Sequence, residues 1–263
     1  MNLLQPYVQK NGKKYQSMRS DDPAVFEYYS FLEEPDTRPI NAVPDGCVDL
    51  LYGIGEHDIR CYLGGTVLKM KYWPFDKNRT YFGIRFYPGQ CILPKDICID
   101  DIINTDVEIS SDAYGINIDD KLYESDCIQK RADIVSDMLN SIVLEVPAAG
   151  CKENIASYIR NRIYETKGCI SIKEISAETG YSECYVRRIF HELHGISPKM
   201  FEKIIRFQNT LDEMTSNSSD GFNSLAMQGG YYDQSHMVKE FKSFVGLTPV
   251  SYTHLTLPTN SLV

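Results

Sequence analysis

The sequence is poor in the residues that build metal centres and redox sites. Its 263 residues include five histidines and one tryptophan, and no two of its eight cysteines form a C-x-x-C pair. Zinc ribbons and thiol redox sites need such pairs, so both are excluded. The first 150 residues hold one histidine, His57. Cupin-type enzymes bind a metal through several histidines and a carboxylate, so we expect no metal, no cofactor and no enzymatic activity.

Long apolar segments are also missing. No run of 18 apolar residues could cross a bilayer, and no basic-then-apolar signal segment opens the chain. We therefore expect a cytoplasmic protein with reduced cysteines and no membrane partner. Hydrophobic residues make up 43% and charged residues 24% of the chain, which excludes a disordered or collagen-like protein.

The net charge of −9 argues at first against a nucleic-acid binder, because a polyanion is repelled by an acidic surface. The charge is unevenly distributed, however. Residues 1–150 carry 15 Lys+Arg against 24 Asp+Glu, a difference of −9, whereas residues 151–263 carry 12 of each. The argument against nucleic acid therefore applies only to the first part of the chain.

The first part has the pattern of a β-rich domain. Short apolar runs alternate with turn signals, and strands are predicted at Cys47–Tyr52, Thr66–Tyr72 and Thr80–Tyr87. The last of these alternates in the manner of a half-buried strand. Such strands at this spacing favour a small β-barrel or sandwich in place of a doubly wound sheet, and we expect a small β-barrel over residues 1–118. The whole chain is then an α+β protein, with an all-α C-terminal domain of two helix-turn-helix units joined by a long helix.

Residues 119–150 are predicted to be a helical linker or a dimerisation helix. Apolar residues recur at helical spacing through Asp119–Leu144 before Pro147 breaks the pattern. An apolar stripe does not identify its partner. It packs either on its own barrel or on the same helix of a second copy, and the sequence leaves both open.

From Cys151 onward the sequence predicts helices, which fall into two similar units. The predicted helices are Lys152–Glu165, Ile172–Thr179, Glu183–His194, Pro198–Thr215, Phe222–Gln228 and Gln234–Phe244. Each unit has a short helix, a glycine turn at Gly180 or Gly230, a second helix, and an exit of the form Gly-x-Ser/Thr-Pro. This is the layout of a helix-turn-helix.

The second unit carries a specific motif. The segment SLAMQGGYYDQSHMVKEFKSFVGLTPVSY, residues 224–252, resembles the signature of the AraC/XylS family of bacterial transcription regulators, and the likeness extends over about 155–252. The resemblance implies that double-stranded DNA is the partner and that each unit places one recognition helix in a major groove. The residues expected to read bases are Cys184, Arg187, Arg188, Gln234, Ser235 and Lys239, and those expected to contact phosphate are Ser182, Lys199 and Lys242.

Other polar residues of these helices receive a structural interpretation. Glu183 and Glu240 would repel phosphate, so we expect them to face away from DNA. His191 and His194 have the i,i+3 spacing of a metal pair, but no third ligand is evident, and surface histidines are the better interpretation.

The first part of the chain shows a weaker resemblance, to an uncharacterised cupin-like module. It rests on residues 43–52, 63–65 and 83–89 and implies a sensing or dimerisation role. Asp45, Asp49 and Arg85 are interpreted as either a buried polar network or ligand contacts. Further expected partners are a small-molecule effector, a second copy in a homodimer and, for an activator, RNA polymerase.

Two alternative functions remain at this point. One is a cupin-type enzyme fused to a helical domain, and the other is a protein-interaction module that has lost DNA binding. Residues 253–263 have no charged or helical pattern, and we expect them to be a disordered, non-native tail.

Overall fold

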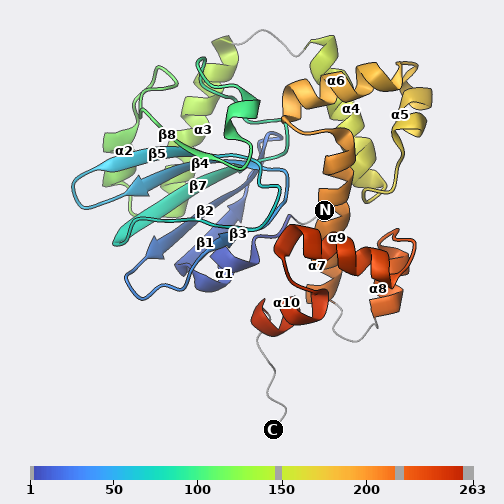
Figure 1. Ribbon diagram of the computed structural model, residues 1–263. Coiled ribbons are helices and arrows are strands. Elements are labelled where there is room, and N and C mark those ends of the chain that lie inside the picture. Colours follow the sequence, from blue (N-terminus) through green and yellow to red (C-terminus); the bar gives the residue numbers. More distant parts are fainter. Residues whose placement is uncertain (1–2, 146–149, 217–221, 257–263) are drawn as a thin grey trace.

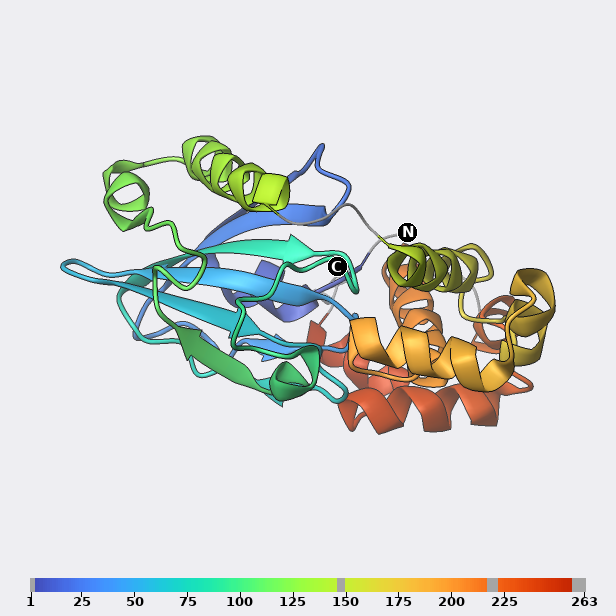
Figure 2. The same ribbon diagram turned by 90° about the horizontal axis from the view of Figure 1, so that it is seen from above.

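The structure is a computed structural model that describes residues 3–145, 150–216 and 222–256. It has a β-sheet part and a helical part that lie side by side (Figures 1 and 2). The expected α+β class is confirmed. None of the helices in these described ranges is long and apolar enough to cross a membrane.

The expected β-rich N-terminal part is present, but its main sheet is open and does not form the predicted small β-barrel. Its six strands are paired antiparallel in the order β1-β2-β7-β4-β5-β8, which leaves β1 and β8 as edges. A second sheet pairs β3 with β6. The strands are β1 Lys13–Arg19, β2 Val25–Glu33, β3 Asn41–Ala42, β4 Val48–Ile54, β5 Ile59–Gly64, β6 Lys71–Tyr72, β7 Arg79–Phe86 and β8 Asp106–Ile109.

The central strand β7 is buried on both faces, not on one as its alternation predicted. Phe82 and Ile84 face a core shared with helix α3 (Ile128–Glu145), whereas Tyr81 packs in a second core with Val8 of helix α1 (Pro6–Asn11). The alternating pattern is therefore real, but it separates two buried sets. A pattern along one strand does not reveal that a helix covers the second face.

The predicted strand Thr66–Tyr72 forms only at its end, as β6. Its first residues bond to a loop instead. The amide of Asn104 donates to the Thr66 carbonyl over 2.9 Å, and the amide of Leu68 donates to the Asn104 side chain over 2.7 Å. The Thr66 carbonyl and the Leu68 amide are therefore bonded to Asn104 and do not pair with a neighbouring strand.

The helix predicted from 119 onward is divided into α2 Asp119–Glu124 and α3 Ile128–Glu145. The apolar stripe of α3 packs on its own sheet, where Val135, Met138 and Leu139 are buried. Tyr28 of β2 adds a 2.8 Å hydrogen bond to Ser136 of α3. Of the two interpretations, the structure shows the helix packed on its own domain.

The helical part is built around one long helix, α7. Its elements are α4 Cys151–Glu165, α5 Ile172–Thr179, α6 Glu183–His194, α7 Pro198–Ser216, α8 Phe222–Gln228, α9 Gln234–Val245 and α10 Pro249–Thr256; the sheet part adds α1 Pro6–Asn11 and a short 3-10 helix, Ile99–Ile102. Helices α6 and α9 lie towards opposite ends of α7 (Figure 1).

The first residues of the predicted tail continue a helix instead of being disordered. Helix α10 runs to Thr256, and its Tyr252 is buried against Phe241 and Tyr7, with ring centroids 5.5 and 6.1 Å away. This anchoring explains why the helix extends past the expected end. Residues 257–263 lie outside the described residues.

One apolar core joins the two parts of the molecule. Leu3, Phe26, Val43 and Cys47 of the sheet part belong to the same buried cluster as the helices α4 to α10. The two parts are therefore packed directly against each other (Figure 2).

Candidate nucleic-acid interface

The first helix-turn-helix unit consists of α5 and α6, and local signals define both ends of α5. Ser171 and Glu174 form a capping box at its start, with the Glu174 amide 3.2 Å from the Ser171 hydroxyl. Gly180 ends it with a φ of +73°, a left-handed conformation that favours glycine. Ser176 donates across the turn to the Tyr181 carbonyl over 2.5 Å. The turn is therefore set by residues inside this unit.

Helix α6 buries one face in the core and exposes the other to solvent. Val186, Ile189 and Phe190 are fully buried. Cys184, Arg187 and Arg188, the three predicted base-reading residues, are exposed, so the structure places them together on the outer side of one helix.

The two arginines of this surface each have a neighbour on α6. Glu183 does not face away, because its carboxylate accepts a 2.6 Å hydrogen bond from Arg187. The Arg188 guanidinium lies 5.2 Å from the ring of Tyr185. Arg187 must release Glu183 to contact a base, and Arg188 is held by a weak cation–π contact.

The second unit repeats this arrangement with α8 and α9. Asp233 caps α9, where its carboxylate accepts from the His236 amide over 2.7 Å, and the preceding turn contains Gly230 with a φ of +70°. Met237 and Phe241 are buried. The predicted base-reading residues of this helix are all exposed: Gln234, Ser235 and Lys239.

The three residues predicted to contact phosphate lie at the surface near helix ends. Ser182 caps α6 and accepts from the Tyr185 amide over 3.3 Å. Lys199 lies in the first turn of α7, where its ammonium is 2.8 Å from Glu202, and Lys242 is exposed in the last turn of α9. Each can reach solvent; a role on DNA stays a prediction.

A buried ion pair fixes α9 against the linking helix. Arg206 of α7 donates to both carboxylate oxygens of Glu240, over 3.0 and 2.9 Å, and to the Gly168 carbonyl over 2.7 Å. Glu240 thus faces away from the expected DNA surface, as predicted, because Arg206 neutralises it inside the domain. The sequence reasoning missed Arg206, whose partner is 34 residues away.

Comparison with known sequences assigns this part of the chain. Residues 175–254 match the family of sequences described as a helix-turn-helix domain, which is of the AraC type. The C-terminal part is an AraC-type helix-turn-helix domain. The chain is accordingly a DNA-binding transcription regulator. No curated protein matches the sequence.

The solved structures that match the chain are distant in sequence. The C-terminal domain of AraT, a response regulator from Geobacillus stearothermophilus, is 18% identical, with 43% of this chain and 95% of that chain covered and a TM-score of 0.40. ToxT from Vibrio cholerae O395 is 11% identical over 93% of this chain and 98% of that chain, with a TM-score of 0.42. Unsaturated fatty acid-bound ToxT from Vibrio cholerae strain SCE256 is 12% identical over 91% and 98%, with a TM-score of 0.43.

One histidine of the AraC-type domain is buried, which corrects the prediction of two surface histidines. His191 is exposed, but His194 is 4% exposed and stacks on Phe190 with ring centroids 3.8 Å apart. Burial lowers the pKa of His194 to about 3, although its 3.1 Å contact with the Phe190 carbonyl opposes the shift. A carbonyl only accepts, so Nδ1 carries the proton, and the neutral ring leaves Nε2 without a hydrogen-bond partner.

Asp45, Asp49 and Arg85 form a buried network in the sheet part ahead of the AraC-type domain. Arg85 donates to both oxygens of Asp49, over 3.0 and 3.1 Å, and to Glu27 over 3.0 Å, and Asp45 lies 3.8 Å from it. Burial raises the pKa of Asp49 to about 6, and the Arg85 charge opposes that rise. Of the two interpretations, the structure shows the polar network. Glu27 was missed because it lies 58 residues from Arg85.

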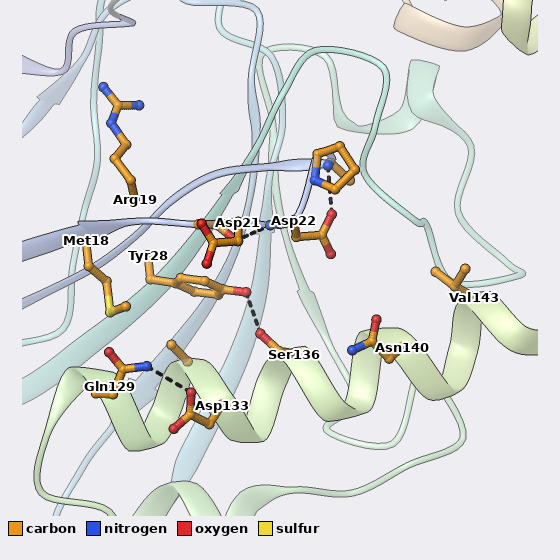
Figure 3. A pocket seen from close by; sticks show the side chains of 14 residues that line it. Met18, Arg19, Asp21, Asp22, Tyr28, Gln129, Asp133, Ser136, Asn140 and Val143 are labelled. Carbon is orange, nitrogen blue, oxygen red and sulfur yellow. Dashed lines mark hydrogen bonds between the residues drawn. The ribbon is translucent and has the colours of Figure 1, made fainter.

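A cavity of about 640 Å³ lies between the β1–β2 hairpin and α3. Figure 3 shows Asp21 and Asp22 on the hairpin side and Asp133 and Asn140 on α3 opposite them. Tyr28 forms the floor and bonds to α3 through its hydroxyl. This site could not be predicted from the sequence, because the residues of its two walls are more than 100 positions apart in the chain.

Proposed function

We propose that the AraC-type domain binds one face of a DNA duplex, with α6 in one major groove and α9 in the next. The observation that carries this proposal is the pair of exposed helix faces at the two ends of α7 (Figure 1). Helix α7 has 19 residues, about 28 Å at 1.5 Å per residue. Successive major grooves on one face are about 34 Å apart, a comparable length.

Different side chains would serve specificity and affinity. Arg187 and Arg188 fit the bidentate recognition of guanine, and Gln234 fits that of adenine. Cys184, Ser235 and Lys239 lie on the same surfaces and complete the proposed base contacts. Phosphate contacts by Ser182, Lys199 and Lys242 would position the domain without reading sequence.

The N-terminal part would regulate this binding. The cavity between the β1–β2 hairpin and α3 is the proposed place for a small-molecule effector, because α3 leads directly towards the AraC-type domain. A homodimer, and contact with RNA polymerase if the protein is an activator, complete the proposal. Since the stripe of α3 is buried on its own sheet, a dimer would need a different surface.

The test is selection of duplexes from a random pool by the full chain, followed by binding measurements on Arg187→Ala. We expect the variant to lose about 1–3 kcal/mol of discrimination at one base position. Lys173→Ala is the matched control, because it removes an exposed positive charge from α5 outside the proposed reading surface.

Two results would count against the proposal. If Arg187→Ala keeps the base preference of the wild type, Arg187 does not read DNA. If the wild type enriches no duplex at all, the chain belongs with interaction modules that have lost DNA binding.

A further inference from the structure

One glutamine of the linking helix is bonded entirely to the N-terminal part of the chain. Gln208 of α7 is fully buried. Its Oε1 accepts from the Leu4 amide over 2.7 Å, and its Nε2 donates to the carbonyls of Pro44, over 2.7 Å, and Leu4, over 3.3 Å. These partners lie 164 and 204 residues away in the sequence. A helix-interior side chain thus joins two segments of the sheet part to α7.

A second glutamine continues this connection into the sheet. Gln5 donates to the Val43 carbonyl over 2.6 Å and to Asp45 over 2.8 Å, and it accepts from the Val43 amide over 3.0 Å. Asp45 in turn is part of the buried cluster around Arg85. A chain of hydrogen bonds and charges therefore runs from the central strand β7, through Gln5 and residues 43–44, to Gln208 on α7.

The sheet part also touches the C-terminal ends of both recognition helices. Next to α6, a Cβ placed on Gly89 would lie 2.5 Å from Nε2 of His194, so only glycine allows this approach. Next to α9, the Met70 amide donates to the Phe244 carbonyl over 2.7 Å. The N-terminal part thus contacts α6, α7 and α9. The relative orientation of these three helices decides whether α6 and α9 can enter two successive major grooves at the same time.

We propose that Gln208 and Gln5 are positioning residues, which dock the N-terminal part on α7 and thereby fix the relative orientation of α6 and α9. The DNA consequence rests on the proposed function, whereas the docking itself does not. Removing the Gln208 amide takes away the partner of the half-buried Leu4 amide and of the buried Pro44 carbonyl. By the usual cost of such groups, docking should weaken by about tenfold or more.

Docking is measured first, by hydrogen exchange of residues 3–11 in the full chain. Gln208→Met keeps the length and the helix preference of the side chain but removes its hydrogen bonds. We expect exchange in this segment to accelerate about tenfold or more, in line with the docking change. The matched control is Asn209→Leu, because the Asn209 amide bonds only to the Ile205 carbonyl of its own helix, over 2.9 Å.

A second variant distinguishes loss of docking from misfolding of α7. Gln5→Met cuts the same connection from the other side and leaves α7 unchanged, so it should accelerate exchange of residues 3–11 in the same way. If neither glutamine variant changes exchange there relative to Asn209→Leu, the docking role is overturned.

Orientation of the two recognition helices is measured on DNA. The duplex selected by the wild type is compared with a version that has one base pair inserted between the two groove sites. We expect the wild type to lose more affinity from the insertion than Gln208→Met does, because a loosely docked pair of units adapts to the new spacing. Binding to a duplex that keeps only one groove site should be equal in both proteins.

The outcomes separate the two proposals. If exchange accelerates but the insertion weakens both proteins equally, the glutamines dock the parts without orienting the helices, and the inference is wrong. If the wild type selects no duplex, the proposed function and the orienting role both fail, and the exchange experiment still decides whether the glutamines hold the two parts together.

Discussion

Replacing His194 by glutamine should remove a defined part of the pH dependence of stability. Burial lowers the pKa of His194 to about 3 in the folded protein, against an ordinary value near 6.5 when unfolded. Between these values the unfolded chain binds a proton that the folded chain excludes. Stability supplied by His194 is therefore present at pH 7 and is lost as the pH falls through 6.5.

The magnitude follows from the distance in pH. A pH of 5 is roughly 1.5 units below the pKa of the unfolded imidazole, and each pH unit corresponds to about 1.4 kcal/mol. This one group therefore lowers the free energy of unfolding by about 2 kcal/mol between pH 7 and pH 5. We expect His194→Gln to lose about 2 kcal/mol less than the wild type between the two pH values, whatever its stability at pH 7.

The assay is urea denaturation of both proteins at pH 7 and pH 5, with His191→Gln as the control. His191 lies on the same helix but is exposed, so its replacement should leave the pH dependence close to that of the wild type. Equal pH dependence in His194→Gln and the wild type would refute the argument, because the folded protein would then accept the proton as readily as the unfolded chain.

Three further predictions concern the helical part. Arg206→Met should destabilise the protein by about 3–5 kcal/mol in urea denaturation, because it leaves the Glu240 carboxylate buried and unpaired. Adding Glu240→Met should recover most of this loss. If the double variant recovers no stability, the Arg206–Glu240 ion pair does not have this role. Lys242→Gln should weaken binding to all duplexes alike and reduce the slope of log affinity against log salt by roughly 0.9, whereas an altered base preference would show that Lys242 reads sequence. Gly180→Ala should cost about 1–2 kcal/mol in thermal unfolding from its left-handed backbone alone, since no atom lies within 4 Å of the added Cβ, and an unchanged midpoint would contradict this.

The helix-turn-helix units could be predicted because their signals are local. The capping box of Ser171 and Glu174, the turn at Gly180 and the spacing of Val186 and Phe190 all fall within 20 residues. Each acts through the backbone or one helix face, so the same pattern produces the same structure in many contexts.

The sheet could be predicted only in part, because its contacts join distant residues. Arg85 has partners 36 and 58 residues away, and neither spacing follows from a pattern along one strand. Likewise, the burial of His194 depends on the approach of Gly89 from the other part of the chain. The prediction of a barrel was wrong for the same reason. The sequence of an edge strand does not reveal whether another strand pairs with its free side.

The shared core has a consequence for synthesis on the ribosome. Leu3, Phe26, Val43 and Cys47 belong to a buried cluster that is completed by helices made much later. At roughly 5–20 residues per second, the stretch from the end of α3 to Gln208 takes several seconds to produce. During that time the sheet part has emerged with an apolar patch uncovered, so the nascent chain should need a chaperone most just before α7 is complete.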